Sequence, residues 1–115
     1  MKITSVSSHV EDFDLTRPYT ITFRSIDDVQ MSFVEIGTDN GLTGIGCASP
    51  EALVTGESRE ASSAALRGDG LSWLEGQDPR TLPALCRELE CRLPAAPAAR
   101  AAVDIALHDL LAHHL

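Results

Sequence analysis

Lysine is almost absent from this chain. Lys2 is the single lysine among nine basic residues, and it stands next to the N-terminus. Schiff-base catalysis, a phosphate-binding loop and a paired-lysine proton relay all need lysine side chains within a site. The sequence therefore excludes lysine chemistry from what this chain does by itself.

Net positive charge and long apolar runs are missing as well. Seventeen acidic residues against nine basic ones give a net charge of −8, which argues against nucleic acid or an anionic membrane as a partner. We find no leader with a charged start and an apolar middle, and no run long enough to span a bilayer. We therefore expect a soluble, unexported, cytoplasmic protein.

Cysteines are few, and their number is odd. Cys47, Cys86 and Cys91 lack the paired spacing of a zinc site or a redox motif. On one helix, Cys86 and Cys91 would point about 140° apart. We therefore expect reduced, buried thiols and no metal site.

The length of 115 residues fits one domain and leaves no room for a (β/α)₈ barrel, which needs about 250 residues.

The first half of the chain has the composition of β-strands. Residues 2–10 alternate partially, and residues 29–36 pass from alternating to continuous apolar character, so we expect an outer strand and a central strand. The intervening residues 11–28 are polar and contain Pro18. They predict a long loop, with at most a short extended piece at residues 19–23.

A tight turn then leads into a third strand. Asp39-Asn40-Gly41 is the strongest local signal in the chain, because an Asn-Gly pair suits a hairpin turn. The strand predicted at residues 42–48 contains Gly44 and Gly46, which would allow another backbone to approach one of its faces closely.

The second half predicts helices. Ser58 can cap a helix that must stop by Gly68, and a short turn around residues 71–74 would place Trp73 in the core. A further helix begins near residues 78–79 or at Thr81 and ends before Pro94. The last helix opens at Pro97 and runs to the end, with apolar side chains over most of its circumference.

This order predicts a single α+β domain. A three-stranded antiparallel meander occupies residues 1–48, a loop spans residues 49–57, and the helical part covers residues 58–115, with the helices on one face of the sheet.

The chain resembles a known family in these elements and in its last helix. The stretch Ala99-Arg-Ala-Ala-Val-Asp-Ile-Ala-Leu-His-Asp-Leu110 resembles the N-terminal capping domain of the enolase superfamily, in its muconate-lactonising and mandelate racemase branch. The resemblance covers the whole chain. Thr16-Arg-Pro-Tyr-Thr-Ile-Thr-Phe-Arg-Ser25 and Pro50-Glu-Ala-Leu-Val-Thr-Gly-Glu-Ser58 are similar to the two specificity loops of dipeptide epimerases that interconvert alanyl-glutamate stereoisomers.

The resemblance implies the substrate-selecting part of a larger isomerase. In the family, a barrel domain holds Mg²⁺ with acidic residues and moves a proton beside a carboxylate with a pair of lysines. These 115 residues contain none of that barrel. We therefore expect the chain to bind no Mg²⁺, to hold no catalytic residue and to be inactive alone. Its expected partners are the C-terminal barrel and a small carboxylate or dipeptide substrate.

Four residues are implied as substrate contacts. The arginine of the epimerase loop contacts the substrate carboxylate, which implies that role for Arg24, since a guanidinium can hold a carboxylate with two hydrogen bonds. Tyr19, Val54 and Thr55 would line the substrate pocket. Without the resemblance, Arg24 is interpreted as a surface residue paired with a nearby aspartate, and the other three as packing their loops onto the domain.

The histidines of the last helix have a structural interpretation. Arg100, Asp104 and His108 recur every four residues on one stripe, which favours an ion-pair stripe over a catalytic Asp-His pair, because no serine, cysteine or metal ligand is spaced to complete a site. His113 and His114 would lie favourably at the helix C-terminus rather than bind a metal.

Two alternatives for the function stay open. The chain could cap a cycloisomerase, an N-acylamino acid racemase or an o-succinylbenzoate synthase, or it could be a stand-alone binding or assembly module without catalysis. In isolation we expect self-association, through the exposed side of the last helix and through Tyr19, Leu53 and Val54, which a barrel would cover.

Overall fold

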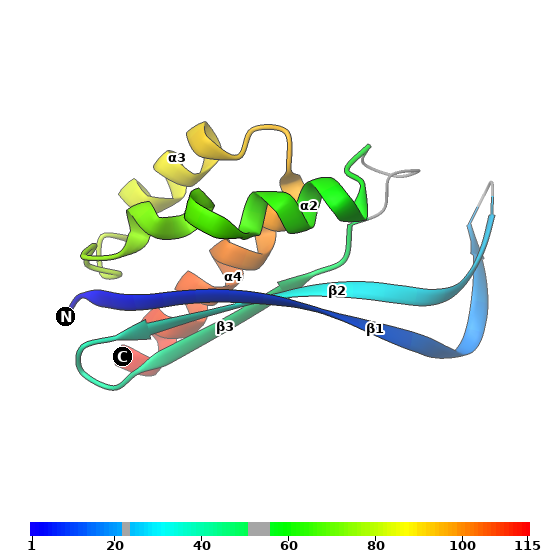
Figure 1. Ribbon diagram of the computed structural model, residues 1–115. Helices are drawn as coiled ribbons and strands as arrows, with labels where there is room; N and C mark the ends of the chain where they lie inside the picture. The colour runs from blue at the N-terminus through cyan, green and yellow to red at the C-terminus, as the bar shows by residue number, and fades with distance from the viewer. Residues whose placement is uncertain (22–23, 51–55) are drawn as a thin grey trace.

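One antiparallel sheet carries, on one face, all the helices of the chain that the structure describes (Figure 1). The computed structural model describes residues 1–21, 24–50 and 56–115, and side chains except those of residues 15–29, 68 and 69. The elements are β1 (Ile3–Ile21), β2 (Arg24–Thr38), β3 (Thr43–Ala48), α2 (Arg59–Leu66), the 3₁₀ helix η1 (Gly68–Leu74), α3 (Leu82–Arg92) and α4 (Pro97–His114). The strand order β1-β2-β3 confirms the predicted meander and the α+β class.

The predicted long loop at residues 11–28 is wrong. β1 and β2 continue through this region as a two-stranded antiparallel ribbon, which extends well past the helices (Figure 1). Beyond the helical layer neither face of the ribbon is covered by a helix that the structure describes, so its strands need no alternation of apolar and polar residues. The register shifts between Asp14 and Tyr19, and Pro18 falls within that irregularity, where a strand tolerates proline.

The predicted turn is present, and three residues, Asp39 to Gly41, form it. The Gly41 N–H donates to the Thr38 carbonyl at 3.2 Å, and Gly41 alone of the turn residues has a positive φ, of 84°. This is the geometry of a three-residue hairpin, in which glycine takes the left-handed position.

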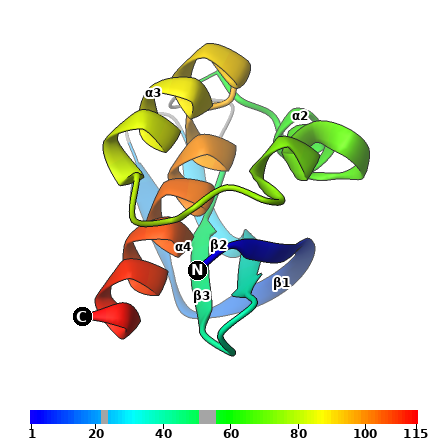
Figure 2. The same cartoon turned by 90° about the vertical axis from the view of Figure 1, so that its left-hand side faces the viewer.

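Helix α4 packs directly on β3, as the two glycines predicted. A Cβ atom on Gly46 would lie 2.0 Å from the Ala102 carbonyl oxygen, and one on Gly44 would lie 2.2 Å from that of Ala106. Figure 2 shows α4 lying along β3, with α2 and α3 above it. Six α4 side chains are buried, and their spacing of three and four residues places them on one side of the helix. The apolar circumference suggested burial on more than one side, which is wrong, because Ile105 on the other side is 48% exposed.

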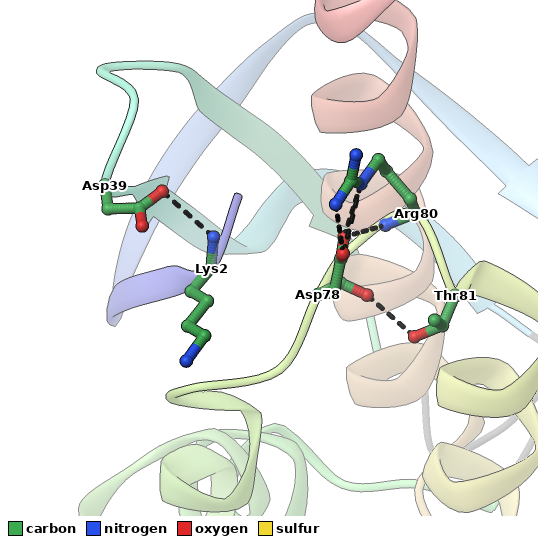
Figure 3. A network of polar contacts seen from close by, with 5 residues as sticks. All are labelled: Lys2, Asp39, Asp78, Arg80 and Thr81. Carbon is green, nitrogen blue, oxygen red and sulfur yellow. Dashed lines mark hydrogen bonds and ion pairs between the residues drawn. The ribbon is translucent and has the colours of Figure 1, made fainter.

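The starts of α2 and α3 agree with the capping residues predicted from the sequence. The Ser58 hydroxyl accepts the Ala61 N–H at 3.0 Å, which confirms the predicted cap of α2. Of the two starts considered for the next helix, Thr81 is correct, because α3 begins at Leu82. Figure 3 shows the turn before it, where the Asp78 carboxylate faces the Arg80 guanidinium and the Thr81 hydroxyl donates to the Asp78 carbonyl at 2.7 Å.

The N-terminus is tied to the β2–β3 turn rather than frayed. The backbone N–H of Lys2 donates to the Asp39 carboxylate at 2.9 Å, and the Asp39 N–H donates to the Lys2 carbonyl at 2.9 Å. The Lys2 ammonium points away from Asp39 (Figure 3). Both chain termini lie at this end of the molecule, opposite the far end of the ribbon (Figures 1 and 2).

The sheet face opposite the helices carries aromatic side chains. The rings of His9 and Phe33 stack at 5.0 Å, and Phe13 meets Phe33 at 6.4 Å. Trp73, the predicted core anchor, is half-buried against the core on the helical side, with the Arg92 guanidinium 5.0 Å above its ring.

Candidate functional site

The far end of the β1–β2 ribbon holds two of the predicted substrate residues. Arg24 pairs with Ile21, and Tyr19 pairs with Ile26, so both lie in the last few residue pairs of the described ribbon. The structure gives their backbone but does not describe their side chains. Val54 and Thr55 lie outside the described residues. The substrate contacts of these four residues remain predictions.

The segment that contains Val54 and Thr55 ends at a buried carboxylate that sequence reasoning missed. Glu57 is only 2% exposed, and its carboxylate accepts the N–H groups of Ala98 at 2.6 Å and Ala99 at 3.1 Å. These N–H groups belong to the first turn of α4, where a helix has no acceptors of its own. A signal was available, because Pro97 opens this helix after an alanine that offers no capping side chain.

The predicted ion-pair stripe on α4 forms only in part. His108 Nδ1 lies 3.1 Å from Asp104 Oδ1 and 2.8 Å from the Asp104 carbonyl. Arg100 does not join them, since its guanidinium donates to the Leu93 carbonyl, 3.2 Å away at the end of α3. That contact satisfies a free carbonyl at a helix C-terminus. Asp104 and His108 therefore pair with each other, whereas Arg100 binds the end of α3.

A cysteine does reach this pair, contrary to the interpretation from spacing. The Cys86 thiol on α3 donates to Asp104 Oδ1 at 3.2 Å. Burial, together with the Asp104 carboxylate, raises the pKa of Cys86 to about 11. Only a thiolate is a good nucleophile, and Cys86 with this raised pKa stays protonated at neutral pH. We therefore interpret the contacts among Cys86, Asp104 and His108 as structural, linking α3 to α4.

The end of α4 is fastened to the outer edge of β3. The Ile45 N–H donates to the Asp109 carboxylate at 2.9 Å, and His113 Nδ1 donates to the Thr43 carbonyl at 2.8 Å. Side chains thereby occupy backbone groups of an edge strand that would otherwise be open to another strand. His113 lies in the last turn of α4, as predicted, and its hydrogen bond to β3 is a contact that sequence reasoning did not predict.

Metal ligands do not gather in the described part of the chain. Among those residues, no three His, Cys, Asp or Glu side chains lie close enough to hold a metal ion. Over the same residues, every helix is too short or too polar to cross a membrane. A groove of about 230 Å³ runs between β1 and α2, lined in part by Val10, Ser63 and Arg67.

The comparisons with known proteins agree with this architecture. The profile of the family described as mandelate racemase / muconate lactonizing enzyme, N-terminal domain, matches residues 3–115. The L-Lys-D/L-Arg epimerase of Methylococcus capsulatus is 61% identical over the whole chain, which spans 32% of that relative. The L-Ala-D/L-Glu epimerase of Clostridium acetobutylicum is 34% identical over an alignment that covers 84% of this chain and 27% of that relative.

A solved structure gives the same fold. The dipeptide epimerase from Methylococcus capsulatus, complexed with Mg and the dipeptide L-Arg-D-Lys, superposes with a TM-score of 0.95 and 60% identity. The match covers 99% of this chain and 32% of that one. The chain thus spans about a third of the length of the relatives it matches, and it corresponds to one domain of larger enzymes.

Proposed function

Because the chain belongs to the mandelate racemase / muconate lactonizing enzyme family, as its N-terminal domain, we propose that it is the capping domain of a dipeptide epimerase. One observation carries the proposal. Nearly the whole chain matches a dipeptide epimerase from Methylococcus capsulatus, in sequence at 60% identity and in shape at a TM-score of 0.95.

In such an enzyme the proton transfer belongs to the domain that follows. Mg²⁺ bound there would stabilise the negative charge that develops when a proton leaves the carbon beside a carboxylate. The described residues of this chain offer no metal cluster, and a chain with a single lysine cannot supply a pair of lysines. Its own task is to choose the substrate and to keep water from it.

We propose that the ribbon and the segment after β3 perform this task. Tyr19 and Arg24 stand in the last pairs of the ribbon, on the part that extends past the helices. Val54 and Thr55 belong to the segment between the buried Pro50 and the buried Glu57. Segments whose ends are held by a rigid scaffold often carry specificity.

Dipeptides with cationic side chains are the first substrate class we propose. The relative with 61% identity is named for lysine and arginine, and the relative named for alanine and glutamate shares only 34%. Residues 11–28 also contain five acidic residues and two arginines. Such a ribbon attracts a cationic substrate more than an anionic one.

An acidic dipeptide such as alanyl-glutamate is the second candidate, and Arg24 favours it. An arginine close to a bound dipeptide could hold its side-chain carboxylate with two hydrogen bonds. The same arginine could instead bind the carboxylate terminus, which every dipeptide carries. The other activities of the branch, cycloisomerisation, N-acylamino acid racemisation and succinylbenzoate synthesis, have no observation of their own in this chain.

A chimeric enzyme would test the proposal. Residues 1–115 would replace the matching part of the Methylococcus capsulatus epimerase, and exchange of the α-proton in D₂O would be followed by NMR for L-Lys-L-Arg and L-Ala-L-Glu. We expect the cationic dipeptide to be preferred by about tenfold or more in kcat/KM. The chain alone should leave both dipeptides unchanged.

The outcomes separate the candidates. A preference for L-Ala-L-Glu that Arg24→Met abolishes would establish the second candidate instead. A folded chimera that exchanges neither dipeptide, beside an active parent enzyme, would contradict the epimerase proposal and leave a binding or assembly module.

We further propose the cytoplasm as the place of action, in keeping with the three free cysteines of the chain.

A further inference from the structure

The last turn of α4 is attached to the sheet, although its side chains are largely exposed. Leu110 is the last buried side chain of the helix, and the ends of helices fray when nothing holds them. Two hydrogen bonds hold this end to β3. The Ile45 N–H donates to the Asp109 carboxylate at 2.9 Å, and His113 Nδ1 donates to the Thr43 carbonyl at 2.8 Å. The helix therefore stays on β3 as far as His113, beyond its buried part.

Asp109 and His113 also contact each other. His113 Nε2 lies 3.5 Å from Asp109 Oδ1, whereas Asp109 Oδ2 accepts the Ile45 N–H. A carbonyl oxygen only accepts, so His113 Nδ1 carries the hydrogen that binds Thr43. Each side chain thus contacts both the strand and the other side chain. Asp109 and His113 together form the α4 anchor.

A second pair of the same residue types on α4 has no hydrogen bond to the sheet within the described part of the chain. His108 Nδ1 lies 3.1 Å from Asp104 Oδ1, at the same spacing of four residues. Five residues separate the two pairs, which places them about 140° apart around the helix. Asp104 therefore meets the Cys86 thiol on α3 instead. An Asp-His pair attaches α4 to the sheet only where it faces the edge of β3.

The strand that receives the α4 anchor is itself fixed in the fold. Gly44 in β3 lies so close to α4 that a Cβ would come within 2.2 Å of the Ala106 carbonyl oxygen. β3 pairs with β2 from Thr43 to Ala48, and β2 pairs with β1 along the ribbon. The end of α4 lies beside the start of β3 (Figures 1 and 2). The α4 anchor therefore fixes the last turn of α4 relative to the whole sheet.

α4 is also the element after which larger relatives continue. The family profile describes an N-terminal domain and matches this chain through residue 115, and the chain spans 32% of the L-Lys-D/L-Arg epimerase from Methylococcus capsulatus. In such an enzyme the chain passes from the last turn of α4 into the domain that follows. Domains of one chain move relative to each other unless contacts restrain them. The direction of this turn therefore bears on how the two domains meet.

We propose that Asp109 and His113 are positioning residues at the junction between the capping domain and the domain that follows. By holding the last turn of α4 against β3, they keep the two domains in the orientation in which a dipeptide binds. The inference rests on the proposed epimerase function, which supplies the second domain. Neither side chain touches the substrate in this account.

The test compares variants of the chimeric enzyme. His113→Ala removes both contacts of the ring, and Asp109→Ala removes the acceptor of the Ile45 N–H. His113→Asn keeps an N–H donor at the position of Nδ1. His108→Ala is the matched control, because the His108 side chain is 59% exposed against 51% for His113, and its contacts stay within α4.

The expected effect is a weaker binding of the dipeptide. A protein that spends less time in its binding orientation binds more weakly by that fraction. We therefore expect His113→Ala and Asp109→Ala to raise KM for L-Lys-L-Arg about tenfold, with kcat within about twofold. His113→Asn and His108→Ala should keep KM within about twofold of the unmutated chimera. Exchange of the α-proton in D₂O measures all of these constants.

Two results would overturn the proposal. One is a KM in folded His113→Ala no higher than in His108→Ala. The other is a His113→Asn variant as weak as His113→Ala, because donation to Thr43 would then not matter. If the unmutated chimera exchanges no dipeptide, the epimerase function has failed, and small-angle X-ray scattering of the same folded variants decides the positioning claim. A larger maximum dimension in His113→Ala than in His108→Ala supports it, and identical scattering profiles overturn it.

Discussion

Cys86 and Asp104 show how one neighbour decides what a side chain can do. The thiol lies on α3 and donates to the Asp104 carboxylate on α4 at 3.2 Å. A thiolate at this position would lose the hydrogen bond and face a negative charge. Burial and this carboxylate together raise the pKa of Cys86 to about 11, so the residue stays a thiol at physiological pH.

Alkylation should therefore distinguish the cysteines. At about pH 8, iodoacetamide should modify Cys86 at least about tenfold more slowly than Cys91, which is exposed. Asp104→Asn should speed the modification of Cys86, because the repelling charge is gone. Peptide mass spectrometry after timed quenching measures both rates. Equal rates for Cys86 and Cys91 would contradict this assignment.

Asp78 gives a second prediction, for acid conditions. Hydrogen bonds from the Arg80 guanidinium and then from the Arg80 backbone N–H, together with the guanidinium charge, hold the pKa of Asp78 well below its usual range. A lowered pKa in the folded state stabilises the protein above the unfolded value of about 3.9, and this stabilisation is lost as the pH falls toward the folded value.

The difference in melting temperature between the protein and Asp78→Asn should accordingly shrink as the pH falls from about 6 to about 2. The effect should be modest, because the pair lies at the surface. Arg80→Gln should reproduce it. A difference that is the same at every pH would show that the carboxylate charge makes no contribution.

At the scale of elements, β3 and α4 approach each other backbone to backbone. A Cβ on Gly46 would lie 2.0 Å from the Ala102 carbonyl oxygen and 2.5 Å from the Ala106 nitrogen. Both are backbone atoms of a helix, so they move only if the helix moves. Overpacking of this kind typically costs about 1–3 kcal/mol, and occasionally more.

Gly46→Ala should therefore lower the free energy of unfolding by about 3 kcal/mol. Cys47→Ala is the control, because the neighbouring residue of a strand faces the opposite side of the sheet, and it should cost less than about 1 kcal/mol. Urea denaturation followed by circular dichroism measures both. Equal stability of the two variants would mean that α4 can shift along the sheet.

The elements that sequence predicted correctly have local signals. The turn at Asn40-Gly41, the Ser58 cap and the proline that opens α4 all act within a few residues. The far half of the ribbon has no such signal, because no helix among the described residues packs on it and neither of its faces imposes an apolar pattern. A polar stretch that contains Pro18 therefore predicts a loop where the structure has strands.

The contacts between residues far apart in the chain could not be predicted from the sequence, for a different reason. Glu57 meets α4 across 41 residues, and the Asp109 bond to Ile45 spans 64. Pro97 after an alanine without a capping side chain indicates that α4 needs an outside acceptor, but the residues around Glu57 and Asp109 do not indicate which groups these two carboxylates meet. Only the packing of α4 on the sheet brings these groups together.

The whole molecule exposes apolar surface on two sides. Phe13 and Ile45 are 43% and 52% exposed, and the sheet face that carries the stacked His9 and Phe33 lacks any helix that the structure describes. Ile105 on α4 is 48% exposed. In the relatives, about two thirds of the chain lies outside the part that this domain matches. A further domain could cover such surfaces, and the isolated domain leaves them open to other copies.

The 115-residue chain should therefore associate in solution, and salt should strengthen the association. Each copy carries a net charge of −8, so copies repel one another at low ionic strength. Because about 1 M salt shortens the screening length to about 3 Å, apolar contact should then prevail. Ile105→Glu should weaken association if α4 is the contact surface, and Ile45→Glu should do so if the sheet is. Sedimentation velocity at two salt concentrations measures this. A monomer under both conditions would mean that neither apolar surface is large enough to hold two copies together.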